Sequence, residues 1–181
     1  MKIKSQNTLG YIIFVLTLIS FFFGFYLREN SAGGGIYDSI HEWDYHLLLK
    51  KDIFNFLTPE YEASRFPFSL ILNIFINPFI QNQSDFILSF FIYSFVLIFL
   101  FYFGLKKILK ISDTNKLLVL TSILLLSPYF RTSSFWGLQE NLSYIFLVST
   151  FLFYERENKN NFLIIFFAFL TYYTDQKFIF I

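Results

Sequence analysis

Long apolar stretches alternate with short polar segments along the chain. Residues 9–27 and 86–105 each run for about 20 residues without a charged side chain. An α-helix rises about 1.5 Å per residue, so about 20 apolar residues are needed to cross about 30 Å of hydrocarbon. These two stretches therefore predict transmembrane helices.

Three further apolar stretches, residues 117–130, 142–154 and 162–173, are shorter. Each would reach only about 20 Å as a helix. Such a stretch can enter a membrane by including neighbouring polar residues or by being re-entrant, where other helices shield it from lipid. We therefore expect an all-α membrane protein, a polytopic bundle of transmembrane helices. The expected spans are residues 9–27, 86–105, 114–130, 135–154 and 161–177.

A signal peptide is the alternative for the first stretch, because Lys2 and Lys4 precede it. Signal peptides have an apolar region of about 7–15 residues that ends at small residues, whereas this stretch is longer and ends in the bulky segment 21–26. An uncleaved span is favoured. The sequence stops within an apolar stretch, so we expect residues 1–181 to form a single transmembrane domain, the N-terminal fragment of a larger protein.

Composition supports the membrane assignment. The chain is 55% hydrophobic, 24% aromatic and 15% charged, whereas soluble domains carry about 25% charged residues. One small soluble core cannot bury so much apolar surface, and disordered chains are poor in aromatic residues. The chain has no cysteine, which excludes disulfides and thiol catalysis.

Basic residues indicate the orientation in the membrane. A lysine cluster follows the second long stretch directly; it consists of Lys106, Lys107, Lys110 and Lys116. Cytoplasmic loops carry an excess of Lys and Arg. We therefore expect a multi-pass protein with a cytoplasmic N-terminus, in an inner or plasma membrane. The polar segments 28–85, 131–141 and 174–177 would share the opposite face.

The first external loop, residues 28–85, contains a glycine-rich turn and an amphipathic segment. The glycines at 33–35 permit positive φ angles and close approach of a ligand to the backbone, or form a simple hinge. The next residues place an apolar stripe (Ile36, Ile40, Trp43 and Leu47) opposite three polar side chains (Asp38, His41 and Glu42) on a helical wheel. This pattern is typical of an interfacial helix. Residues 68–80 predict a second interfacial or partly inserted helix.

Asp38 and His41 are the candidates for chemistry in this loop. A carboxylate and an imidazole three residues apart on a helix can cooperate in general-base catalysis; the alternative is that both belong to the solvated face. Metal binding is not favoured, because Asp38, His41, Asp44 and His46 point in different directions and match no known ligand spacing. We expect no cofactor, with a divalent metal as the alternative.

Glu140 and Asp175 border two of the shorter apolar stretches. An ionisable residue within a membrane is costly and is a functional site by default. For Glu140 and the adjacent Asn141 the cheaper alternative is a position at the membrane interface, which we favour.

Several of these segments together resemble a known family. They are the turn Glu29–Gly35, Asp38, the triplet Arg65-Phe66-Pro67, and the segment Arg131–Asn141. This set is similar to the membrane glycosyltransferases of the GT-C fold that use polyprenyl-phosphate sugars. The Asp-x-x-His of Asp38 and His41 is loosely similar to the acidic first-loop motif of the dolichyl-phosphate-glucose-dependent branch. The chain covers only part of such an enzyme, which usually has about ten or more spans.

The resemblance implies a hexosyltransferase acting in glycan biosynthesis at the cell envelope. Asp38 would be the catalytic base, with His41 beside it. Substrate binding would involve Glu29, Arg65, Arg131, Trp136, Glu140 and Asn141. Arg is suited to the donor phosphate because its planar fork binds phosphate bidentately. The implied partners are membrane lipid, a polyprenyl-phosphate sugar and an acceptor that is a glycan, a lipid or a protein; no nucleic acid is implied.

Plainer readings exist for the same residues. Arg65 and Arg131 could be snorkelling interfacial arginines, and Trp136 could belong to the aromatic belt of the membrane interface. At the level of the whole chain, the alternatives are a non-enzymatic transporter or flippase component and a small structural membrane protein.

Overall fold

The computed structural model describes residues 6–61, 67–156 and 160–175. Within these ranges all regular structure is helical, which confirms the all-α prediction. The helices are α1 (Gln6–Tyr26), α2 (Gly35–Lys51), η1 (Ile53–Leu57), α3 (Phe68–Ile76), α4 (Gln83–Ile108), α5 (Thr114–Leu126), α6 (Pro128–Trp136), α7 (Glu140–Tyr154) and α8 (Asn161–Thr174).

Two of the described helices are long and apolar enough to cross a membrane: α1, over Thr8–Tyr26, and α4. A third crossing would result if α5 and α6 together form one bent span. α8 is apolar but shorter. These helices indicate a membrane protein. The full set of five spans stays a prediction.

The apolar stretch at residues 114–130 is broken at Ser127. Pro128 disfavours helical backbone in the residue before it, and Ser127 is extended, with φ −63° and ψ 123°. α5 ends at Leu126, and α6 leaves it at an angle of 62°. The helix over residues 114–130 is therefore not continuous, while the span itself stays a prediction.

The residues of the span predicted at 135–154 belong to two different helices. Gly137 adopts a left-handed backbone (φ 72°) that ends α6, so Phe135 and Trp136 belong to that helix. α7 begins only at Glu140. Glu140 consequently lies in the first turn of a helix.

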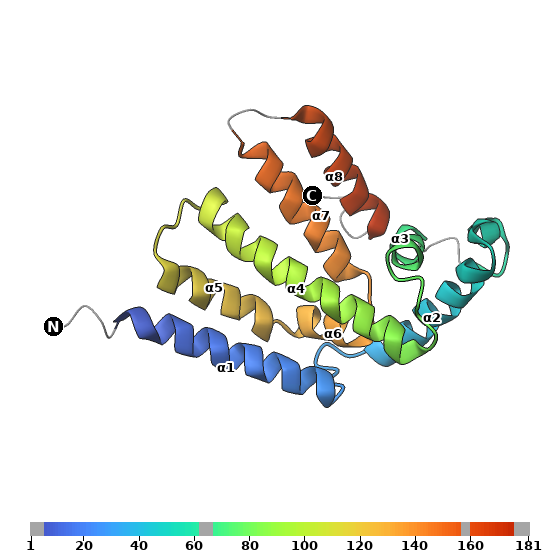
Figure 1. Cartoon of the computed structure of the whole chain (residues 1–181), viewed down its shortest axis with the longest axis horizontal. Helices are drawn as coiled ribbons and strands as arrows, with labels where there is room; N and C mark the ends of the chain where they lie inside the picture. Colours follow the sequence, from blue (N-terminus) through green and yellow to red (C-terminus); the bar gives the residue numbers. More distant parts are fainter. Residues whose placement is uncertain (1–5, 62–66, 157–159, 176–181) are drawn as a thin grey trace.

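α4 is central in the arrangement of helices. It contacts α7, α6 and α5, while α1 runs beside α5 and α8 folds back on α7 (Figure 1). The core between α1, α4 and α6 is aromatic. The ring of Phe21 lies 5.4 Å from Phe91, 5.3 Å from Phe130 and 5.0 Å from Phe135, measured between centroids. Such ring pairs stabilise beyond the area they bury.

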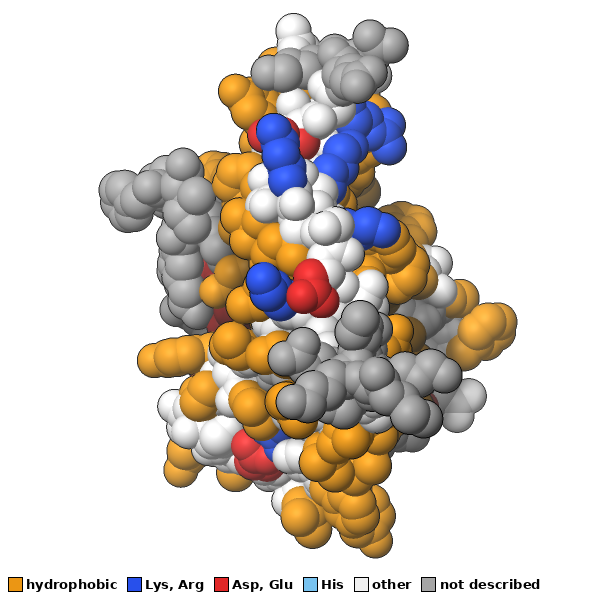
Figure 2. Space-filling view, turned by 90° about the vertical axis from the view of Figure 1, so that its left-hand side faces the viewer, with side chains coloured by type: hydrophobic (Ala, Val, Ile, Leu, Met, Phe, Trp, Pro, Cys, Tyr) orange, Lys and Arg blue, Asp and Glu red, His pale blue; other side chains and the backbone are white. Residues whose placement is uncertain are grey.

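One end of this bundle is basic. α1 and α5 begin there, and α4 and α7 end there, at the left of Figure 1. Figure 2 looks onto this end and shows Lys and Arg side chains gathered on it. We call it the basic end, defined by the exposed residues Lys106, Lys107, Lys110, Lys116 and Arg156. The lysines of the predicted cluster thus lie at one end of the bundle, while the side of the membrane they face stays a prediction.

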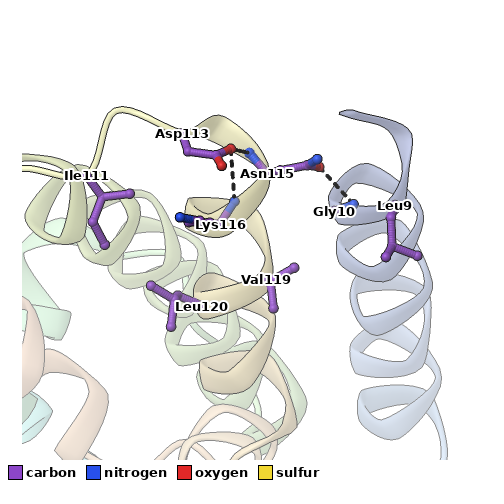
Figure 3. Close-up of a pocket in the computed structure, with 8 residues that line it drawn as sticks. All are labelled: Leu9, Gly10, Ile111, Asp113, Asn115, Lys116, Val119 and Leu120. Carbon is purple, nitrogen blue, oxygen red and sulfur yellow. Dashed lines mark hydrogen bonds between the residues drawn. The ribbon is translucent and has the colours of Figure 1, made fainter. Parts of the chain in front are cut away.

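Gly10 allows α1 to approach α5 closely at the basic end. The backbone N–H of Gly10 donates to Oδ1 of Asn115 over 2.9 Å (Figure 3). A Cβ at position 10 would lie 2.3 Å from that oxygen. Small residues at helix contacts are a common means of close packing in membrane proteins.

The segment 28–85 contains helices where they were expected, α2 and α3, and they pack on the start of α4. Leu49, Leu70, Phe86 and Phe90 form their shared core. Ile36, Ile40 and Leu47 are exposed on α2, as expected for side chains that face lipid. η1 follows α2, and the Asp52 side chain accepts from the backbone N–H of Phe54 at its start.

The polar face of α2 differs from the prediction. Glu42 was expected to face water but is only 4% exposed. It belongs to the face that packs inward, together with Ser39, His46 and Leu49. Trp43, expected in lipid, instead packs beside Phe86 with ring centroids 5.7 Å apart. The helix is therefore rotated relative to the simple amphipathic prediction, so that Glu42 and His46 are covered by protein while His41 is exposed.

Candidate functional site

A cavity of about 480 Å³ brings together three carboxylates from distant parts of the sequence. Asp38 comes from α2, Glu140 from α7, and Asp175 directly follows α8. The remaining lining residues supply hydroxyl groups, backbone and two apolar side chains: Ala32, Gly33, Tyr129, Thr132, Ser133, Leu138 and Tyr144. We call this the acidic cavity.

The acidic cavity lies away from the basic end. α7 starts at the cavity with Glu140 and ends at Tyr154, two residues before Arg156. Its 15 residues correspond to about 22 Å at 1.5 Å per residue. The two regions of opposite charge are thus separated by most of the length of one helix.

The glycine-rich turn places Asp38 at the cavity. Gly33 and Gly34 have φ angles of 76° and 75°, in the left-handed region that favours glycine. Gly35 packs so closely on α6 that a Cβ there would lie 2.7 Å from Trp136. The backbone N–H of Ala32 donates to Oγ1 of Thr132 over 3.0 Å. The turn is therefore fixed to α6, and α2 starts with Asp38 in its first turn.

Glu140 is positioned by α6. The hydroxyl of Ser133 lies 3.3 Å from Oε2 of Glu140 and 3.2 Å from the carbonyl oxygen of Leu138. The left-handed Gly137 allows the chain to reverse between these residues. As a result Glu140 is the first residue of α7. The helix dipole favours a negative charge such as its carboxylate at this end of the helix.

Asp175 was noticed in the sequence as an ionisable residue at the edge of an apolar stretch, but its grouping with Asp38 was not predicted. It caps the end of α8, where its backbone N–H donates to the carbonyl oxygen of Thr171 over 3.3 Å. The side chain is 3% exposed. Tyr129 and Tyr144 were missed entirely, and no local motif marks them.

His41 does not share the cavity with Asp38. It is exposed on α2 and is not among the lining residues. Of the two side chains, Asp38 lines the cavity and His41 does not. The arrangement of the described residues therefore does not support the predicted pairing of Asp38 with His41.

Arg131 and Glu29 form an ion pair with each other. Nε of Arg131 donates to Oε1 of Glu29 over 2.9 Å, and Nη2 contacts Oε2. The guanidinium also donates to the carbonyl oxygens of Ser20, at 3.0 Å, and Leu125, at 3.2 Å. The hydrogen bonds from Arg131 lower the pKa of Glu29, against a smaller opposing effect of burial. All three guanidinium nitrogens of Arg131 thus have hydrogen-bond partners within the protein.

Trp136 and Asn141 are also held within the protein. Nε1 of Trp136 donates to the carbonyl oxygen of Glu29 over 2.9 Å. Nδ2 of Asn141 contacts Oγ of Ser134 at 2.7 Å and Oγ of Ser94 at 3.2 Å. Both side chains connect different elements of the fold and do not line the acidic cavity. Arg65, the remaining candidate, lies outside the described residues.

The chemistry of the acidic cavity follows from its lining. Carboxylates and hydroxyls are hydrogen-bonding partners for a polyhydroxylated ligand such as a sugar, and a carboxylate can accept a proton. Among the described residues no Lys or Arg lines the cavity. No set of three His, Asp or Glu side chains in this part of the chain is arranged to hold a metal ion.

Comparison with known proteins identifies no relative. No protein-family model, curated protein or solved structure matches this chain. The functional proposal below therefore depends on the acidic cavity and on the sequence.

Proposed function

We propose that the acidic cavity is the acceptor side of a membrane glycosyltransferase site, to which a polyprenyl-phosphate sugar delivers its sugar. The observation that carries the proposal is the convergence of Asp38, Glu140 and Asp175 on one cavity with the hydroxyls of Tyr129 and Tyr144. Carboxylates in pairs or groups are the usual groups for binding sugar hydroxyls and accepting protons from them.

In the proposed reaction an acceptor hydroxyl attacks the anomeric carbon of the donor sugar. The bond between that carbon and the phosphate oxygen breaks, and the polyprenyl phosphate leaves with the electron pair. Asp38 accepts the hydroxyl proton as the new glycosidic bond forms. Glu140 and Asp175 orient sugar hydroxyls through hydrogen bonds. Asp38 is the preferred base because the fixed glycine turn and the first turn of α2 hold it at the cavity.

The exposed apolar face of α2 supports a donor that is anchored in lipid. Ile36 is 45% exposed and Ile40 is 45% exposed, and both lie within two residues of Asp38. In an interfacial helix these side chains would enter the lipid. A lipid-linked sugar could thus reach Asp38 without leaving the membrane surface.

We assign Arg131 to the framework rather than to the donor phosphate, because its guanidinium is already bonded to Glu29 and to two carbonyl oxygens. Phosphate binding stays a prediction for Arg65. We further propose a cytoplasmic basic end, from the excess of Lys and Arg there, which would place the acidic cavity on the opposite side of the membrane.

The proposal can be tested with membrane vesicles that contain the full chain. Polyprenyl-phosphate monosaccharides with radiolabelled glucose, mannose or arabinose are added separately, and transfer of label away from the lipid is measured. We expect transfer from at least one lipid donor and none from the corresponding nucleotide sugars. Movement of the intact labelled lipid across the vesicle, without loss of its sugar, would instead support a transporter or flippase component.

A further inference from the structure

A second cavity, of about 540 Å³, lies between α1 and α5 at the basic end. Its polar rim is formed by Asp113, Asn115 and Lys116 (Figure 3). Its walls include Leu9 from α1 and Val119 and Leu120 from α5. We call it the basic-end cavity. It takes no part in the site described above.

Polarity changes along the length of the basic-end cavity. Lys116, Val119 and Leu120 are spaced by three and four residues, so they lie on one face of α5. Lys116 is in the first turn, nearest the polar end, and the two apolar side chains follow one turn further in. Leu9 provides apolar surface from α1. The cavity therefore suits a ligand with a polar head and an apolar tail.

The charge at the polar end is positive. Lys106, Lys107, Lys110 and Lys116 are all exposed. Asp113 is the acidic residue among the rim residues, and its Oδ1 accepts from the backbone N–H groups of Asn115, at 2.9 Å, and Lys116, at 3.4 Å. That carboxylate caps α5. Lys116 is the lysine that lines the cavity, and Lys106, Lys107 and Lys110 lie at the same end of the bundle. An anionic head group complements this end.

We propose that the basic-end cavity binds one anionic membrane phospholipid. The phosphate of the head group lies at Lys116, with the neighbouring lysines of the basic end around it, and one acyl chain lies along Val119, Leu120 and Leu9. Clusters of four or more basic residues beside a membrane helix attract anionic lipids, by about 1 kcal/mol for each Lys near the surface. The apolar walls add selectivity for a lipid over a free phosphate, and the proposal is independent of glycosyl transfer.

The experiment measures bound lipid on the full chain in neutral detergent by native mass spectrometry. Dioleoyl phosphatidylglycerol and dioleoyl phosphatidylcholine are titrated separately, since they differ in charge and share their acyl chains. We expect tighter binding of phosphatidylglycerol. Lys116→Gln should weaken it about fivefold, the factor that corresponds to about 1 kcal/mol. Lys51→Gln is the matched control, because Lys51 is exposed in the last turn of α2, and it should leave binding unchanged.

A second variant and a competitor test the apolar half. Val119→Phe fills the wall of the cavity and should also weaken phosphatidylglycerol binding, whereas glycerol 1-phosphate, which has no acyl chain, should not compete with the lipid. Equal affinity for the two lipids would overturn the proposal. A Lys116→Gln variant that binds phosphatidylglycerol as tightly as Lys51→Gln would also overturn it, since binding would then depend on the overall positive charge of the protein and not on Lys116. Effective competition by glycerol 1-phosphate would overturn it as well.

Discussion

Arg131 and Glu29 are joined by two contacts although they are far apart in the sequence, and the pair connects α6 to the turn after α1. The side chain of Arg131 is 7% exposed and that of Glu29 is 32% exposed. The same guanidinium lies over the ring of Phe135, 5.3 Å from its centroid. Because the glycine turn that carries Asp38 starts just after Glu29, this ion pair also fixes the position of the acidic cavity.

Removal of one partner should destabilise the fold. Glu29→Gln leaves the buried Arg131 without its opposite charge, and breaking such a pair typically costs about 3–5 kcal/mol. We expect about 3 kcal/mol here, at the lower end, because water reaches part of Glu29. The measurement is thermal unfolding of the purified protein in detergent. Glu155→Gln, an exposed carboxylate at the basic end, is the control and should behave like the wild type.

The lowered pKa of Glu29 adds a pH dependence to the same prediction. The folded state holds the ionised carboxylate more strongly than the unfolded state does. The stabilisation is therefore present above the ordinary pKa of 4.5 and is lost as the pH falls through the lower folded-state value. Glu29→Gln should remove this acid sensitivity; an unchanged acid profile would show that the pair contributes little.

Gly10 should not tolerate a side chain. Gly10→Ala would place a methyl group 2.3 Å from Oδ1 and 2.7 Å from the backbone oxygen of Asn115, so α1 must move away from α5. We expect a lower melting temperature in detergent despite the gain of about 1 kcal/mol in helix propensity. Gly104→Ala is the matched control: its Cβ would meet two side chains, Val148 at 3.2 Å and Ile108 at 3.8 Å, and no backbone of another helix, so it should be near neutral. Equal effects would contradict the close contact.

His46 should make the protein less stable on mild acidification. It is 1% exposed, neither ring nitrogen has a hydrogen-bond partner, and burial lowers its pKa to about 4 from 6.5. The unfolded state gains a proton near pH 6.5 and the folded state only near pH 4, so stability falls between these values, by at most about 3 kcal/mol. His46→Phe keeps an aromatic ring between Trp43 and Phe86. The melting temperature of this variant should depend much less on pH between about 4 and 6.5. His41→Phe, at an exposed position, should not.

The sequence predicts the helical class well because the apolar runs are long and uninterrupted. Both long runs form helices, α1 and α4, since no proline or charged residue interrupts them. The shorter runs are less predictable. Pro128 and Gly137 bound a helix, α6, whose residues Phe130–Trp136 are all buried. Tertiary packing covers its polar residues, which no local pattern in the sequence shows.

The acidic cavity was only partly predictable for a different reason. A turn of three glycines before an acid marks Asp38 locally, and an ionisable residue beside an apolar run marks Glu140 and Asp175. Nothing local shows that the three meet, because their grouping depends on the bend at Ser127 and the reversal at Gly137. For Arg131, the charge was visible in the sequence, but its partner Glu29 was a candidate for a different role.

The proposed chemistry makes its sharpest prediction at Asp38. Asp38→Asn keeps the size of the side chain and much of its hydrogen bonding but cannot accept a proton from the acceptor hydroxyl. General-base assistance contributes about 10²–10⁴-fold, so we expect a loss of sugar transfer of that order. Asp44→Asn is the matched control, since Asp44 lies on the same helix and is exposed; it should transfer sugar at the wild-type rate.

Binding and turnover must be measured separately for this prediction, with the lipid donor that gives transfer in vesicles. The Asp38→Asn variant should reach the wild-type protein level and melt at a similar temperature, because Asp38 lies at a cavity and not in the core. Its affinity for the donor should persist while turnover falls. Glu140→Gln should instead weaken substrate binding, since that carboxylate orients the sugar. If Asp38→Asn turns over at the wild-type rate, Asp38 is not the base, and Glu140 or Asp175 must accept the proton.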